Sequence, residues 1–298
     1  MGDSLLEIRR GDRFAFGRNW KAFAHLVDET RVATAVDSLC AALGIEDLTG
    51  RTFLDVGCGS GLFSLAAHRL GARVHSFDFD PEAVETALRL RQAFAPGADW
   101  VIEQGSILDG DYVARLGTFD LVYSWGVLHH TGAMWKAFEA SIGLVAPGGL
   151  LFVALYNDQG WESRLWTVVK RRYNRSGPVL RGALLAASSA YIYRGRPLIR
   201  LGQALTGRRR PTGPRARGMS RWHDMIDWVG GYPFEVSRPE QVIACAHDLD
   251  LVYLKTCGGG LGCNEFVFRK AVGSGDAQAL AEPAGDLAGL GGSREQPA

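Results

Sequence analysis

The stretch FLDVGCGSG, residues 53–61, decides the fold of this 298-residue chain. A short apolar run, Thr52–Val56, leads into three alternating glycines, and the helical pattern Leu62–Leu70 follows them. A strand, a glycine-rich turn and a helix in this order are typical of the crevice in which doubly wound α/β proteins hold nucleotide-like ligands. Glycine lets the backbone turn tightly and lets a ligand approach its amide groups.

The spacing of the glycines separates two kinds of ligand. The Gly-x-Gly-x-x-Gly pattern of nicotinamide cofactors, counted from Gly57, requires a glycine where the chain has Leu62. Asp55 ends the strand before the glycines, and its carboxylate or the carbonyls of the loop can satisfy the α-amino group of a methionine sulfonium cofactor. The loop therefore favours S-adenosylmethionine over a nicotinamide, and an ordinary strand–helix turn is the simpler alternative.

Beyond the loop, short apolar runs alternate with helical periodicity, which predicts a parallel sheet covered by helices. The predicted strands are Thr52–Val56, Arg73–Phe77, Trp100–Gln104, Phe119–Ser124, Leu150–Tyr156, Leu251–Thr256 and Glu265–Arg269. The predicted helices are Arg18–Val27, Glu29–Leu43, Leu62–Leu70, Pro81–Gln92, Met134–Leu144 and Arg238–His247. The sequence Ala146-Pro147-Gly148-Gly149 is predicted to be a turn, and the last two strands a terminal hairpin.

More candidates for cofactor binding follow the next strands. Asp78 ends the second strand, where a carboxylate can accept both hydroxyls of a ribose, and Phe79 beside it can cover an adenine face or simply be buried. The complete set of candidates is Asp55, Gly57, Cys58, Gly59, Gly61, Asp78, Phe79, Ser106, Ile107, Ser124 and Trp125. Ser106 is the weaker assignment, because its loop lacks the acidic residue often found there.

Six stretches in order resemble the class I S-adenosylmethionine-dependent methyltransferases, in particular the small-molecule group that includes the ubiquinone-biosynthesis methylases. They are FLDVGCGSG (53–61), VHSFDFDPEAV (74–84), EQGSILD (103–109), FDLVYSWGVLHH (119–130), APGGLLFVALYN (146–157) and YLKTCGGGLGCNEFVF (253–268). The resemblance implies a Rossmann-like, doubly wound seven-stranded sheet whose last strand is antiparallel. It also implies S-adenosylhomocysteine as the product and an acceptor placed over the carboxyl ends of the strands, but it does not identify the acceptor.

Methyl transfer requires positioning and, for a hydroxyl acceptor, removal of a proton. His129 and His130 follow the fourth strand, and histidine titrates near neutral pH, so either can be a general base, with His130 preferred. A second cluster of polar and aromatic residues runs from Arg221 to Trp228 and continues to Pro233. It supplies His223 and Asp224 as further catalytic candidates. Substrate-binding candidates are Tyr156, Trp222, Trp228 and Tyr232. The alternative is that the histidines pack or cap a turn and that the second cluster is an amphipathic helix.

The chain divides by pattern into five parts. They are a helical cap (1–50), the cofactor-binding core (51–156), a helical insertion (157–232), the C-terminal part of the core (233–270) and a disordered tail (271–298). Within the cap, Phe16–Trp20 either covers the cofactor or packs on the core. The insertion holds 15 Lys and Arg against 4 Asp and Glu, a net charge of +11, in a chain whose net charge is +1. This charge fits an anionic acceptor, an anionic membrane surface or arginines that solvate an outer face.

Composition and cysteine usage indicate where the protein is located and whether it binds a metal. No basic start with an apolar stretch opens the sequence, and five scattered cysteines do not form a disulfide framework, so we expect a cytoplasmic protein. Cys257 and Cys263 lack the partners of a zinc site, and no metal is predicted. Nucleic acid is not expected as a partner, membrane contact is a weaker alternative, and a dimer is compatible with the sequence.

The prediction is methyl transfer to O or N of a small polar acceptor that is sugar-bearing, anionic or a natural product. The rivals are a membrane-docked lipid or quinone methylase, and a cofactor binder without methyl transfer.

Overall fold

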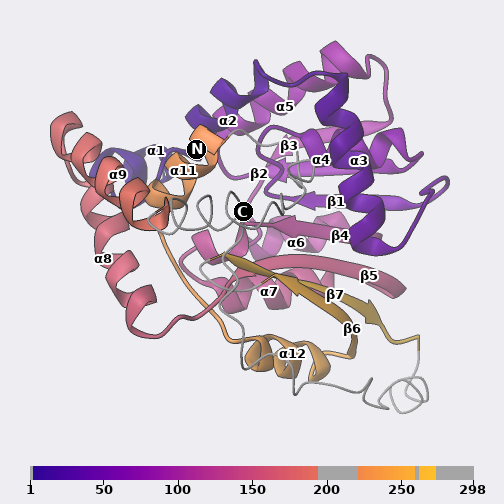
Figure 1. Ribbon diagram of the computed structural model, residues 1–298. Helices are drawn as coiled ribbons and strands as arrows, with labels where there is room; N and C mark the ends of the chain where they lie inside the picture. Colours follow the sequence, from indigo (N-terminus) through magenta and orange to yellow (C-terminus); the bar gives the residue numbers. More distant parts are fainter. Residues whose placement is uncertain (1–2, 194–220, 259–261, 273–298) are drawn as a thin grey trace, which may run out of the picture.

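A seven-stranded sheet forms the centre of the molecule (Figure 1). The structure is a computed structural model that describes residues 3–193, 221–258 and 262–272. The strands are β1 (Thr52–Val56), β2 (Arg73–Asp78), β3 (Trp100–Gln104), β4 (Phe119–Trp125), β5 (Val145–Tyr156), β6 (Leu251–Gly258) and β7 (Cys263–Lys270). Their order is β3-β2-β1-β4-β5-β7-β6, and only β7 runs antiparallel to its neighbours. The predicted fold class, with its antiparallel last strand, is confirmed.

Helices cover both faces of the sheet and extend beyond one end of it. The helices are α1 (Asp3–Arg10), α2 (Phe16–Ala24), α3 (Glu29–Leu43), α4 (Leu62–Arg69), α5 (Pro81–Phe94), α6 (Gly110–Leu116), α7 (Met134–Gly143), α8 (Trp161–Asn174), α9 (Pro178–Tyr193), α11 (Arg221–Gly230) and α12 (Pro239–His247), with the 3₁₀ turn η1 (Leu128–His130). Apolar side chains of α3, α4 and α5 form the core on one face. Those of α6, α7 and α12 form the core on the other. This two-sided burial explains why the central strands read as continuous apolar runs.

The predicted turn at 146–149 is wrong, because these residues belong to β5. Phe119 of β4 pairs with Val145 and Leu121 pairs with Leu150, so a short piece of β4 faces a longer piece of β5. The additional residues bulge out of the ladder, and Gly148 takes a φ of 74°, which glycine adopts without strain. Helix α6 was also missing from the prediction.

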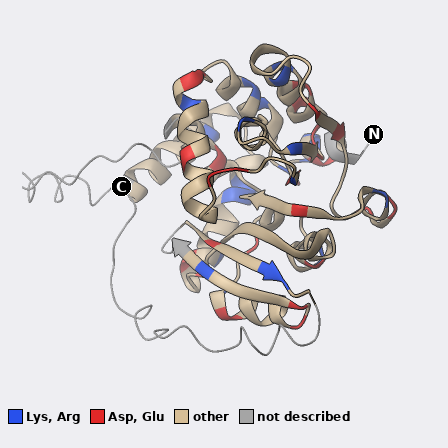
Figure 2. Ribbon diagram, turned by 90° about the vertical axis from the view of Figure 1, so that its right-hand side faces the viewer, with Lys and Arg blue, Asp and Glu red and all other residues tan. Residues whose placement is uncertain are grey.

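Helices α8, α9 and α11 lie beyond the carboxyl end of β5, on the left of Figure 1 beside α1, and α2 contacts both α11 and α5. All three belong to the predicted insertion. Eight of its 15 basic residues fall between 194 and 220, outside the described residues, and so does the predicted tail from 273 onward. Figure 2 shows basic and acidic residues interspersed along the described helices. Among these helices, none is both long enough and apolar enough to span a bilayer.

Candidate functional site

The glycine loop lies at the carboxyl end of β1 and is closely covered from two sides. Gly57 has a φ of 75° and Gly59 a φ of 54°, a region that side chains with a Cβ rarely adopt. A Cβ at Gly57 would lie 2.4 Å from Cγ1 of Val127, and one at Gly59 would lie 2.9 Å from the indole of Trp20. The two glycines therefore permit both the turn and the close approach of neighbouring side chains.

Two carboxylates link the loop to β2 and to the N-terminal helices. The backbone N–H of Gly59 donates to Oδ2 of Asp78 at 2.9 Å, and the N–H of Asp80 donates to Oδ1 of the same carboxylate at 2.9 Å. Asp80 in turn accepts from the N–H of Gly17 at 2.9 Å. Burial raises the pKa of Asp78 to about 6. Each carboxylate oxygen has a second lone pair, so Asp78 can still accept a bond from a ligand hydroxyl.

A chain of buried hydrogen bonds holds Asp55 beneath the loop. The indole N–H of Trp100 donates to Oγ of Ser76 at 2.7 Å, and Oγ of Ser76 lies 2.7 Å from Oγ of Ser64. Oγ of Ser64 donates to Oδ2 of Asp55 at 2.5 Å. Since the Ser64 proton goes to Asp55, Ser76 is the donor to Ser64, and the chain runs in one direction from β3 to β1. Burial raises the pKa of Asp55 to about 7, against the lowering effect of its bond to Ser64.

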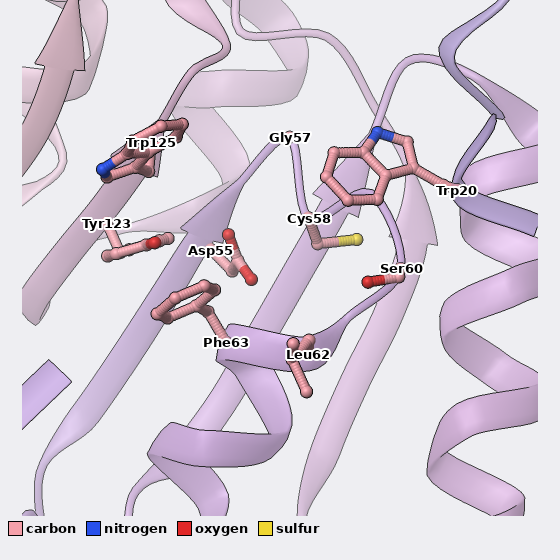
Figure 3. A pocket seen from close by; sticks show the side chains of 9 residues that line it. All are labelled: Trp20, Asp55, Gly57, Cys58, Ser60, Leu62, Phe63, Tyr123 and Trp125. Atoms are coloured by element: carbon pink, nitrogen blue, oxygen red, sulfur yellow. The ribbon is translucent and has the colours of Figure 1, made fainter. Parts of the chain in front are cut away.

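A pocket opens beside this carboxylate (Figure 3). Asp55 lies at its centre, with Trp20 on one side and Trp125 on the other. The lining residues are Trp20, Asp55, Gly57, Cys58, Ser60, Leu62, Phe63, Tyr123 and Trp125. Asp55, Gly57, Cys58 and Trp125 were predicted from the sequence. Phe63 and Tyr123, whose rings stack 5.1 Å apart, were missed, because an aromatic residue in a helix or strand gives no signal of its own.

Four other residues that were predicted to bind the cofactor do not line this pocket. The ring of Phe79 lies 5.0 Å from the guanidinium of Arg13, and Oγ of Ser106 accepts from the N–H of Leu108 at 3.2 Å. Ile107 is buried. Ser124 is fully buried and its Oγ donates to the carbonyl of Val56 at 3.3 Å, so its side chain points into the sheet, not into the pocket.

The two candidate bases lie in η1, on the far side of Val127 from the loop, and both are buried. Nδ1 of His130 donates to the carbonyl of Pro233 at 2.6 Å, which leaves Nε2 with the lone pair. Burial lowers the pKa of His130 to about 3, with Lys170 and Arg13 adding to the effect. Nδ1 of His129 accepts from the N–H of Tyr156 at 3.3 Å, so its Nε2 carries the proton, and this atom is buried with no hydrogen-bond partner in the described part of the chain. Both rings are therefore neutral at neutral pH.

The residues of the second cluster, on α11 and directly after it, lie in two separate parts of the structure. His223 lies against α2, where its carbonyl accepts from Asn19 at 3.0 Å, while Asp224 and Trp222 are exposed. At the other end of α11, Trp228 packs near Tyr156, and the hydroxyl of Tyr232 accepts from Nη2 of Arg171 at 2.9 Å. The structure thus places Tyr156 and Trp228 together and Trp222 away from them.

Lys170 of α8, which was not predicted from the sequence, lies between Tyr156 and Trp228. Its Nζ lies 5.4 Å from the ring centre of Tyr156, 4.6 Å from that of Trp228 and 4.6 Å from that of Phe234. It donates to the carbonyl of Trp228. The side chain is fully buried, and burial lowers its pKa to about 7. A signal existed in the sequence, because Lys170 continues a buried helical stripe at four-residue spacing from Trp166 to Asn174.

Comparison with known proteins agrees with this geometry. Residues 54–151 match the family model described as a methyltransferase domain. A ubiquinone biosynthesis O-methyltransferase of Methylobacterium sp. (strain 4-46) is 34% identical over 138 residues, 45% of this chain and 54% of that protein. One of Methylocella silvestris is 30% identical over 167 residues, 51% of this chain and 63% of that protein. The matched segments thus span between half and two thirds of these relatives.

A solved structure has the same fold at low sequence identity. The structure of PKMT2 from Rickettsia typhi in complex with AdoHcy superposes with a TM-score of 0.51 and 16% identity. The superposition covers 80% of this chain and 52% of that one.

The raised pKa of Asp55 predicts a specific dependence of stability on pH. Because the folded pKa, about 7, lies above the ordinary value, the contribution of Asp55 is present at low pH and is lost as the pH rises through about 7. Between about pH 5 and about pH 8 this loss lowers the free energy of unfolding by about 2 kcal/mol. Urea unfolding of the ligand-free chain at both pH values should therefore show a change that is about 2 kcal/mol more unfavourable in wild type than in Asp55→Asn, and this difference separates Asp55 from His130, Lys170 and Asp78, whose pKa values are also shifted.

Asp120→Asn is the matched control. The pKa of Asp120 is lowered, chiefly by its bond to the N–H of Thr52, so its contribution does not change between these pH values. This variant should keep the pH dependence of the wild-type chain. Equal dependence in Asp55→Asn and wild type would show that Asp55 does not have a raised pKa.

Proposed function

Because residues 54–151 are a methyltransferase domain of the class I S-adenosylmethionine-dependent type, we propose that the chain transfers a methyl group from S-adenosylmethionine to O or N of a small polar acceptor. The observation that carries the proposal is the joint position of Asp55 and Asp78 at the glycine loop. The names of the relatives, both O-methyltransferases, support an oxygen acceptor.

The loop and its carboxylates fit this cofactor. Gly57 and Gly59 place no side chain over the loop, and Asp78 can accept from ribose hydroxyls while it holds the N–H of Gly59. Asp55 lies in the pocket where the amino-acid part of the cofactor belongs. When bound, the cofactor supplies a methyl group on a positively charged sulfur. The chain then has to exclude water and hold the acceptor in line with that methyl group.

His130 is the proposed base for a hydroxyl acceptor. The Pro233 carbonyl holds its Nδ1–H, so Nε2 is oriented and can accept a proton. This arrangement resembles the way in which a general base is held by its second ring nitrogen. The low pKa of His130 keeps that lone pair available throughout the neutral range.

The test of the cofactor site is calorimetric titration with S-adenosylhomocysteine. Asp78→Asn keeps the shape of the side chain but removes its charge, and should weaken binding about tenfold or more. Asp111→Asn, at an exposed position of α6, should bind like wild type. Incubation with methyl-labelled cofactor and a metabolite extract should yield S-adenosylhomocysteine and a labelled acceptor. Binding without either product would leave a cofactor binder that does not transfer methyl groups.

With the acceptor from that experiment, His130→Ala should lower kcat about a hundredfold while KM for the cofactor changes little. The turnover of wild type should stay constant above about pH 5 and fall as the pH approaches the His130 pKa of about 3. His247→Ala, on the exposed side of α12, is the control. A kcat within about twofold of wild type in His130→Ala would remove the proposed base.

A membrane-docked lipid or quinone methylase is the second candidate, favoured by exposed apolar side chains on α8 and α9. Trp161 is 67% exposed, Val168 65% and Val179 88%, and basic residues of α8 such as Arg172 lie among them. Flotation with vesicles of anionic phospholipid should then recover wild-type chain and lose Trp161→Ser/Val168→Ser. A chain that stays at the bottom of the gradient would exclude this candidate.

A further inference from the structure

Lys170 is a buried cation without a carboxylate partner. Within the described residues it takes part in no salt bridge, and its Nζ has a single hydrogen-bond acceptor, the carbonyl of Trp228. Cys263 and Asp227 act on it only through longer-range charge, and the carboxylate of Asp227 accepts from the side chain of Asn19 at 2.7 Å. An ammonium group has three protons to donate. Removing it from water with one acceptor is costly, and apolar residues of similar volume are often as stable there.

Two further donors beside Lys170 also lack acceptors. Nε2 of His129 and Nε1 of Trp166 are buried, and neither has a hydrogen-bond partner among the residues that the structure describes. Because the N–H of Tyr156 fills Nδ1 of His129, Nε2 of this neutral ring is a donor. Trp166 can only donate. Buried donors without acceptors are rare in folded proteins and call for an explanation.

Each of the other two donors shares one aromatic neighbour with Lys170. The ring of His129 lies 4.0 Å from that of Tyr156, which also faces Lys170. The ring of Trp166 lies 4.2 Å from that of Trp228, which faces Lys170 from another side. We refer to Lys170, His129 and Trp166 as the donor cluster. Its members come from α8 and η1, segments that are separate in the sequence.

The donor cluster lies on the acceptor side of the glycine loop. Tyr156 ends β5, which is two strands from β1 in the sheet, a distance of about 10 Å. Val127, two residues before His129, packs on Gly57 of the loop. The rings of Trp228 and Phe234 are partly exposed, so the cluster borders solvent on their side.

We propose that the donor cluster binds an anionic oxygen group of the methyl acceptor, a carboxylate or a phosphate. The proposal rests on the proposed methyl transfer and adds the chemical class of the acceptor. Such a group supplies several acceptor oxygens, and bonds from an ionised donor to an ionised acceptor are the strong ones. It would replace the single carbonyl contact of Lys170 and satisfy the two orphaned N–H groups. The surrounding aromatic rings exclude water and favour an acceptor with an apolar or aromatic body.

Calorimetric titration of the full chain saturated with S-adenosylhomocysteine tests the proposal. The probes are benzoate, phenyl phosphate and, as the neutral reference, benzyl alcohol. Wild type should bind one of the two anions about tenfold or more tightly than the alcohol, and the preferred anion separates a carboxylate from a phosphate. Lys170→Met should lose this preference about tenfold, and Trp166→Phe, which removes one donor, about fivefold. The measured quantity is the ratio of anion affinity to alcohol affinity.

The controls separate binding from folding and from general charge. Arg172→Met removes the same charge from an exposed position of the same helix and should keep the wild-type ratio. Lys170→Met should melt at or above the wild-type temperature, because an apolar chain replaces a buried cation. A ratio that is equal in wild type and Lys170→Met, or an absence of anion binding by wild type, overturns the proposal. If S-adenosylhomocysteine does not bind, the proposed function fails, and the same titration of the unloaded chain decides the donor cluster separately.

Discussion

The directed hydrogen-bond chain from Trp100 through Ser76 and Ser64 to Asp55 is the interaction on which the site depends. It crosses three parallel strands and the first residues of α4, so it fixes the loop relative to the sheet as well as the carboxylate itself. The hydroxyls of Ser76 and Ser64 each receive one proton and donate one, so both are satisfied. A buried carboxylate in this position costs free energy, and its raised pKa is the measure of that cost.

Three segments that are distant in the sequence meet around this fixed loop. The N-terminal segment supplies Trp20 over Gly59 and Arg13, whose guanidinium donates to the carbonyl of His130 at 2.8 Å. Helix α8 supplies Lys170, and the end of α11 supplies Trp228 and the chain toward Pro233. The core therefore holds the glycine loop and its carboxylates, whereas the added helices supply Lys170 and Trp228. This division agrees with the extent of the family match, which ends at residue 151.

The sequence predicted the core because its signals are local. Alternating apolar runs, the glycine spacing and the strand-end carboxylates Asp55 and Asp78 can each be read within a few residues, and the antiparallel last strand follows from the resemblance. The bulge at Gly148 was misread, since a Pro-Gly-Gly sequence is more often a turn than a strand. The spacing of Lys170 from Trp166 indicates only a shared helix face, and the donor cluster itself could not be predicted, because burial of Lys170 depends on rings supplied by β5, by α11 and by the segment after α11. The same holds for the orphaned Nε2 of His129, whose tautomer is set by a backbone N–H from another element.

A crystal structure of the full chain grown with S-adenosylhomocysteine tests the central claim most directly. We expect the ribose hydroxyls to contact the carboxylate of Asp78 and the amino-acid part of the ligand to lie over residues 57–61 beside Asp55. The sulfur should be directed toward the side of Tyr156. Ligand density elsewhere on the molecule, or a ribose without contact to Asp78, would contradict it.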